Sequence, residues 1–100
     1  MRKKYSVYSI FGMPFTVYLT DELEPNIVGL CLYDTQTILI KKDLDQESFN
    51  VTLIHELLHA FMRRLGYENA LTMQTEEILI DQIAKMLNEN FTLKQRKQKG

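Results

Sequence analysis

Residues 51–62 of the chain read VTLIHELLHAFM, an apolar run interrupted by two histidines and one glutamate. Apolar side chains occur on almost every side of a helix drawn through this run, which predicts a helix that is buried on most of its surface. Its only strongly polar stripe carries Thr52, His55, Glu56 and His59. Residues four apart share one helical face, so the two imidazoles can converge on one point. Polar groups buried without partners cost roughly 1–3 kcal/mol each, and a bound metal is the simplest partner for two imidazoles.

The pattern H-E-x-x-H at residues 55–59 is the arrangement that presents two imidazoles and a carboxylate to one zinc ion. His55 and His59 are the predicted zinc ligands. Glu56 lies about 100° further round the helix, where it can reach the attacking water without binding the metal, and it is the predicted general base. Both histidines of the chain belong to this motif. An accidental match on an amphipathic surface helix is the alternative, and the apolar flanks argue against it.

A catalytic zinc site needs a third protein ligand, which we expect from the acidic residues of a following helix. The candidates are Glu68, Glu76, Glu77, Asp81 and Glu89. Glu77 lies 18 residues after His59, far enough for the chain to reverse at Gly66 and pass back across the metal. Glu77 and Asp81 share one helical face, so Glu77 can bind zinc while Asp81 accepts a hydrogen bond from a ligand histidine. Glu76 is the rival ligand, and an acid-rich helix N-terminus is the simpler explanation of the pair.

The remaining pattern predicts an α+β fold in which a small, mostly antiparallel sheet of about four strands packs on two helices. Alternating Tyr, Val, Ile and Phe predict strands over residues 5–11 and 15–20, joined by a turn at residues 12–14. A second strand pair is expected over residues 28–33 and Thr37–Lys41, around residues 34–36. The metal-binding helix would then pack against this sheet.

Helix boundaries follow from capping residues. Asp43 or Asp45 can cap the first helix, with Gln46 or Ser48 three residues on, and Gly66 ends it after about Leu65. The second helix is expected over about residues 72–90. Its apolar stripe consists of Ile80, Ile83, Ala84, Leu87 and Phe91.

Composition and charge are those of an ordinary globular domain. With 45% hydrophobic and 25% charged residues, 100 residues are expected to form one domain over the whole chain. A net charge of −1 and a pI near 6.1 argue against nucleic acid as a partner, and the basic run over about residues 92–100 is expected to be a solvated end. Cys31 has no cysteine partner, which favours a reducing, cytoplasmic setting. No apolar run approaches the ~20 residues that span a membrane.

The motif and its spacing resemble a known family. HELLH at residues 55–59, followed by E-x-x-x-D at residues 77–81, resembles the zinc-binding core of gluzincin metallopeptidases, in compact form the ImmA/IrrE-type and small phage-encoded zincins. Residues 29–34 and 37–40 also resemble the strand pair before the active-site helix of such proteins. The resemblance covers about residues 28–90 and implies a minimal zincin-like fold. It implies these roles: zinc ligands His55, His59 and Glu77, general base Glu56, and histidine-orienting Asp81.

The same comparison disfavours two other groups of zinc proteins. Metzincins continue the motif as H-E-x-x-H-x-x-G-x-x-H, and endoribonuclease-like zinc proteins carry H-x-x-x-H-x-x-x-x-x-H. Both patterns need a third histidine where this chain has Leu65.

These features predict a zinc-dependent peptidase that cleaves a specific intracellular protein. An extended substrate would add to the sheet edge, for which Thr37–Lys41 is the expected strand. Larger gluzincins place a histidine or tyrosine where it stabilises the oxyanion; here Tyr67, Tyr33 and Arg63 are the candidates. The alternative is a zincin-fold protein-binding module with a structural or vestigial metal. Only the resemblance suggests a phage or another mobile element as the source.

Overall fold

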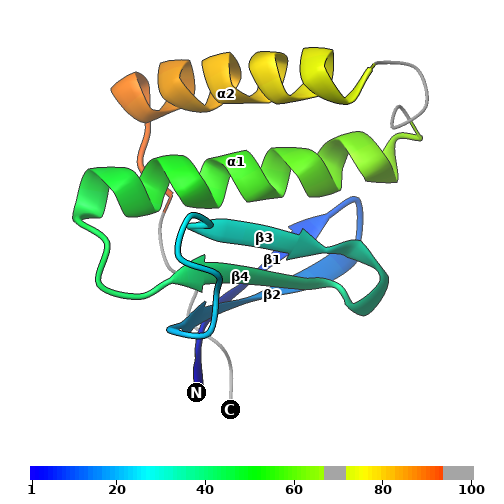
Figure 1. The fold of residues 1–100 in the computed structure, drawn as a ribbon. Coiled ribbons are helices and arrows are strands. Elements are labelled where there is room, and N and C mark those ends of the chain that lie inside the picture. The colour runs from blue at the N-terminus through cyan, green and yellow to red at the C-terminus, as the bar shows by residue number, and fades with distance from the viewer. Residues whose placement is uncertain (67–71, 94–100) are drawn as a thin grey trace.

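The computed structural model describes residues 1–66 and 72–93 (Figure 1). The elements in chain order are β1 (Arg2–Ile10), β2 (Met13–Thr20), β3 (Gly29–Leu32), the short 3-10 helix η1 (Tyr33–Thr35), β4 (Thr37–Lys41), α1 (Gln46–Arg64) and α2 (Met73–Asn90). Helix α1 packs on the sheet, and α2 packs on the side of α1 that faces away from the sheet (Figure 1). The α+β class predicted from the sequence is confirmed.

The four strands have the order β1-β2-β4-β3. β1 and β2 are antiparallel, as are β3 and β4, while β2 and β4 are parallel. The sheet is therefore mostly antiparallel, as predicted. The expectation that Thr37–Lys41 forms a sheet edge is wrong, because β4 is paired on both sides. Ile38, Leu39 and Ile40 are consecutive buried residues, and a strand that is apolar on both faces belongs inside a sheet.

The first hairpin is longer than predicted and turns earlier. Phe11 and Gly12 form its two-residue turn with φ angles of 49° and 82°, and Ile10 pairs with Met13. Positive φ at both turn residues matches the right-handed twist of the two strands. Met13 and Pro14 therefore belong to β2 instead of to the turn.

The core lies between the sheet and α1. Its fully buried residues are Phe15 and Val17 of β2, Ile38 and Ile40 of β4, and Leu53 and Ala60 of α1. Asp45, and not Asp43, caps α1: its Oδ1 accepts a hydrogen bond from the Ser48 amide at 2.7 Å. Beyond the last turn of the helix, Gly66 has a φ of 81°, a conformation that glycine adopts without strain.

Helix α2 is held on α1 by a narrow stripe. Ile80 and Ala84 are buried, as predicted, and Ile83 and Leu87 are partly buried. Phe91, the last residue of the predicted stripe, is instead 63% exposed. The backbone leaves the helix there in an extended conformation, with φ −139° and ψ 150°, so its side chain departs from the helical face.

The segment after α2 returns to α1 through one asparagine. Asn50 Nδ2 donates to Asn88 Oδ1 at 2.6 Å, and Asn50 Oδ1 accepts from the Leu93 amide at 3.2 Å. Leu93 also packs against the core. Most of the predicted basic tail, residues 94–100, lies outside the described residues. Within the described ranges, neither helix has the length and apolarity needed to cross a bilayer.

Candidate metal centre

Helix α1 supplies three polar side chains to one site. Leu53 and Ala60 are seven residues apart, so they share a helical face, and their burial against the sheet fixes the rotation of the helix. His55 and His59 are thereby turned away from the core and remain partly exposed. Glu56 lies nearer the buried face and is only 8% exposed. Core packing therefore determines which way the predicted site residues of α1 point.

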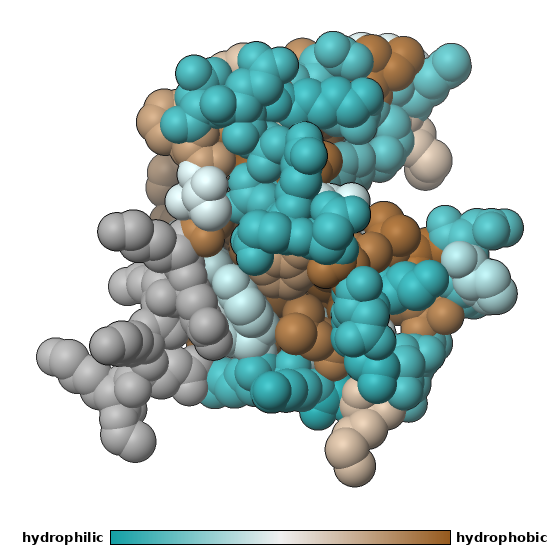
Figure 2. Space-filling model, turned by 90° about the vertical axis from the view of Figure 1, so that its left-hand side faces the viewer, coloured by the Kyte–Doolittle hydropathy of each residue, from teal (hydrophilic) through white to brown (hydrophobic). Residues whose placement is uncertain are grey.

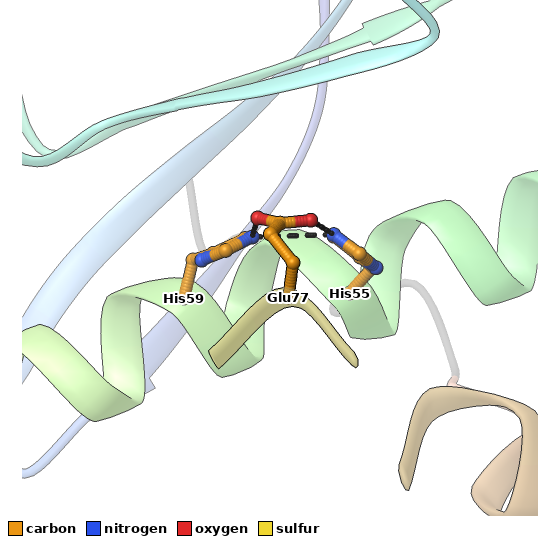
Figure 3. Close-up of side chains that lie close together, drawn as sticks. All are labelled: His55, His59 and Glu77. Atoms are coloured by element: carbon orange, nitrogen blue, oxygen red, sulfur yellow. Dashed lines mark hydrogen bonds and ion pairs between the residues drawn. The ribbon is translucent and has the colours of Figure 1, made fainter. Parts of the chain in front are cut away.

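Glu77 of α2 meets both histidines (Figure 3). The Nε2 atoms of His55 and His59 are 3.2 Å apart, Glu77 Oε1 is 2.7 Å from His59 Nε2, and Glu77 Oε2 is 3.4 Å from His55 Nε2. One ligand atom from each of the three residues lies within 4.8 Å of the others. Neighbouring ligands of a tetrahedral zinc ion with bonds of about 2.0–2.1 Å stand roughly 3.4 Å apart. Two imidazoles and a carboxylate at these separations fit zinc in donor type, charge and spacing.

The outer nitrogen of His59 faces a second carboxylate of α2. Glu76 Oε1 lies 3.2 Å from His59 Nδ1. If Nδ1 carries the proton, Glu76 accepts its hydrogen bond and the lone pair of Nε2 is left for a metal. The sequence predicted Glu76 as a rival ligand and gave this orienting position to Asp81.

Asp81 lines the same groove and its charge acts on His55, but among the described contacts it has no hydrogen bond to either histidine. Its Oδ2 pairs with Lys85 Nζ at 2.9 Å, one turn further along α2. The reason is the crossing of the two helices. Glu76 lies about 100° round α2 from Glu77 and reaches His59, whereas Asp81 follows one turn later, beyond that histidine.

Glu56 is packed against the backbone of β3. A Cβ atom at Gly29 would stand 3.0 Å from Glu56 Oε2 and 2.7 Å from Thr52 Cγ2, so a glycine is needed for this close approach. Burial raises the pKa of Glu56 to about 7, while His59 acts to lower it and Glu77 to raise it. The sequence pattern did not predict a role for Gly29, whose only signal is a glycine at the start of a strand.

His55 and Cys31 have shifted pKa values that favour their neutral forms near pH 7. Burial and the neighbouring His59 lower the pKa of His55, although Glu77 and Asp81 oppose the shift. A neutral imidazole is the form that binds a metal. Burial raises the pKa of the Cys31 thiol to about 11, so this residue stays protonated and is a poor metal ligand.

The site lies on the floor of an open groove of about 820 Å³. Residues 26–31 and Tyr33 form one wall, α1 forms the floor, and the start of α2 forms the other wall. Figure 2, viewed from the end where α1 begins, shows the hollow on the right, between α2 above and the β3 side of the sheet below. Tyr33 and Arg63, two of the predicted oxyanion stabilisers, line the groove. Tyr67, the third, and Glu68 lie outside the described residues.

Comparison with known protein families gives a match over most of the chain. The family model Peptidase M78, described as the IrrE N-terminal-like domain, matches residues 10–97. This range includes β2, β3, β4, both helices and every residue of the metal site. No curated protein and no solved structure matches the chain.

Proposed function

The chain belongs to the IrrE N-terminal-like domain family of M78 peptidases, and on that premise we propose that it is a zinc-dependent peptidase that cleaves a specific intracellular protein. One observation carries the proposal. The ligand atoms of His55, His59 and Glu77 converge beside a buried glutamate, Glu56, that is not one of the three. A purely structural metal site has no need of such a base.

The residues present define the chemistry of the site. A zinc ion held by His55, His59 and Glu77 would polarise the scissile carbonyl and lower the pKa of water to about 7. Glu56 takes the proton from the attacking water and passes it to the leaving amine. With a pKa near neutrality, this carboxyl can both accept and release a proton, and a nearby cation favours its charged form. Glu76 keeps His59 oriented through Nδ1.

An extended substrate is proposed to add to β3 and not to β4. β3 is one of the two edge strands of the sheet, the other being β1, and it forms a wall of the groove. Its outer backbone N–H and C=O groups can pair with a peptide, and alternate side chains of that peptide would then face the floor of the groove. Among the described residues, Tyr33 remains the proposed group near the developing oxyanion.

A protein-binding module with a structural metal is the second candidate. This candidate is supported by the exposed apolar side chains Ile78, Leu79 and Met86 of α2, which a partner protein could cover. Such a module would not depend on proton transfer by Glu56. The two functions therefore differ in their response to one substitution.

Glu56→Gln separates the candidates. Glutamine is nearly isosteric but cannot accept the proton, so the variant should retain zinc and fold while peptide hydrolysis is lost. Zinc-loaded wild type and variant are incubated with host-cell lysate, and new protein N-termini are identified by mass spectrometry. Glu47→Gln, in the first turn of α1 and exposed, is the matched control and should cleave like wild type. Identical products in wild type and Glu56→Gln, or no products while a partner is still captured, contradict the peptidase.

A further inference from the structure

Arg63 occupies one end of the groove, one helical turn beyond His59. Its guanidinium lies over the ring of Tyr33, 5.0 Å from the ring centroid. Its Nη2 is 4.0 Å from Asp34 Oδ1, a carboxylate whose side chain is 92% exposed. Stacking on an aromatic ring holds the guanidinium in a defined plane, with its five N–H donors directed around the edge of that plane. A guanidinium held in this way presents a planar fork of donors whose geometry matches a carboxylate.

The charges along the groove make Arg63 distinctive. Among the described residues that line the groove, it is the one arginine or lysine. The carboxylates that line the groove are Glu56, Glu76, Glu77 and Asp81. Glu76 and Glu77 face the histidines, and Asp81 pairs with Lys85. A substrate with an acidic side chain would therefore meet repulsion along the α2 wall and attraction at the Arg63 end.

The direction of a bound peptide follows from the sheet. β3 and α1 run in the same direction (Figure 1), since Gly29 approaches Thr52 and Glu56 while Tyr33 lies under Arg63. Antiparallel pairing is slightly more stable than parallel pairing. A peptide antiparallel to β3 would enter with its N-terminal part at Arg63 and leave at the start of α1. Residues before the scissile bond therefore pass the guanidinium.

We propose that Arg63, stacked on Tyr33, forms a substrate subsite for an aspartate or glutamate side chain on the N-terminal side of the scissile bond. This assignment rests on the proposed peptidase function, because it presumes that a peptide lies along β3. A bidentate pair between a guanidinium and a carboxylate also has a fixed geometry, so it would set the register of the peptide as well as its affinity.

A binding experiment tests the subsite without cleavage. The probe is a library of octapeptides with randomised positions, applied to the immobilised zinc-loaded Glu56→Gln variant, and the retained peptides are sequenced by mass spectrometry. Acidic residues should be enriched about tenfold at one position, as for a charge-assisted hydrogen bond. Adding Arg63→Gln should abolish the enrichment, and adding Arg63→Glu should replace it with enrichment of lysine and arginine. Arg64→Glu, an exposed neighbour that does not line the groove, is the control and should leave it unchanged.

The outcomes distinguish the subsite from the peptidase function. No retention of peptides, no acidic enrichment, or enrichment that survives Arg63→Glu overturns the subsite, whatever the lysate experiment shows. Acidic enrichment that depends on Arg63, without Glu56-dependent cleavage in lysate, supports the subsite and contradicts the peptidase.

Kinetics separate substrate binding from oxyanion stabilisation. Two peptides that wild type cleaves are compared, one with glutamate at the enriched position and one with glutamine. Arg63→Gln should raise KM about tenfold for the glutamate peptide and leave kcat and the glutamine peptide unchanged. An equal fall in kcat for both peptides would show that Arg63 acts on the transition state, and would overturn the subsite.

Discussion

Helices α1 and α2 contribute to the same candidate metal site, but the fold holds them very differently. α1 is packed on both sides, with Leu53 and Ala60 in the core of the sheet and α2 on the opposite side. α2 buries only Ile80 and Ala84 among its described residues, and its outer face exposes Leu79. The free energy that positions α2 therefore comes mainly from the burial of this narrow apolar stripe against α1.

This difference divides the candidate site into two halves. His55, Glu56 and His59 belong to the half that the core positions before any metal binds. Glu76 and Glu77 belong to the half that depends on the apolar stripe between α2 and α1, and Glu77 is a half-exposed side chain. A metal bound by residues of both halves would hold the two helices together and stabilise their contact. Four predictions test this comparison, from the largest expected effect to the smallest.

Removal of zinc should loosen α2 far more than α1. At a free zinc concentration 1,000 times Kd, binding to the folded state alone is worth about 4 kcal/mol of unfolding free energy. Urea denaturation with and without zinc measures this difference, and hydrogen exchange locates it. The amides of α2 should lose protection while those of α1 around Leu53 keep theirs. Equal loss of amide protection in both helices would contradict the division of the site into a half positioned by the core and a half that depends on α2.

Glu56 should make the zinc-free protein less stable as the pH rises. Its pKa is raised from 4.5 to about 7 in the folded state, so between these values the folded protein binds more protons than the unfolded chain. The unfolding free energy contributed by Glu56 is therefore fully present below about pH 4.5 and falls by about 3 kcal/mol as the pH rises through 7.

The comparison of wild type with Glu56→Gln isolates this pH dependence, because the lowered pKa of His55 acts in the opposite direction in both proteins. Urea titrations at several pH values between 4 and 8 give the difference in unfolding free energy between the two proteins. It should decline with pH even when α2 is loosened, since the core and Gly29 bury Glu56. A difference that does not depend on pH would contradict the burial of this carboxyl.

Glu76→Ala should weaken zinc binding by roughly 10–100-fold, the usual loss when a partner of a ligand histidine is removed. Asp81→Ala should change the affinity by less than about threefold, because Asp81 forms an exposed pair with Lys85. Competition with a zinc indicator measures both affinities, and Glu89→Ala, exposed near the end of α2, is the control. Equal losses for Glu76→Ala and Asp81→Ala would restore the role that the sequence assigned to Asp81.

Leu79→Ala should alter the unfolding free energy by less than about 0.5 kcal/mol, since this side chain lies on the exposed face of α2. Leu53→Ala, in the fully buried face of α1, serves as the reference and should cost 2–5 kcal/mol in the same urea experiment. A loss above about 1 kcal/mol for Leu79→Ala would show that the outer face of α2 is packed in solution.

Local sequence determined the features that depend on neighbours a few residues apart. The spacing of His55 and His59, a helix cap at Asp43 or Asp45, and the stripe of Ile80 and Ala84 follow from helical periodicity and from hydrogen bonds within one turn. The strands were predicted to within a few residues for the same reason. The first hairpin turned earlier than predicted, because positive φ at Phe11 was not evident from its residue type.

Only the tertiary structure decided how these elements meet. The parallel pairing of β2 with β4 placed β3 at the edge, since a strand that is apolar on both faces is stable only inside the sheet. The crossing of α2 over α1 put Glu76 beside His59 and left Asp81 with Lys85. The approach of Gly29 buried Glu56. Each of these contacts joins residues distant in sequence, and their positions depend on how whole faces pack, which no local pattern encodes.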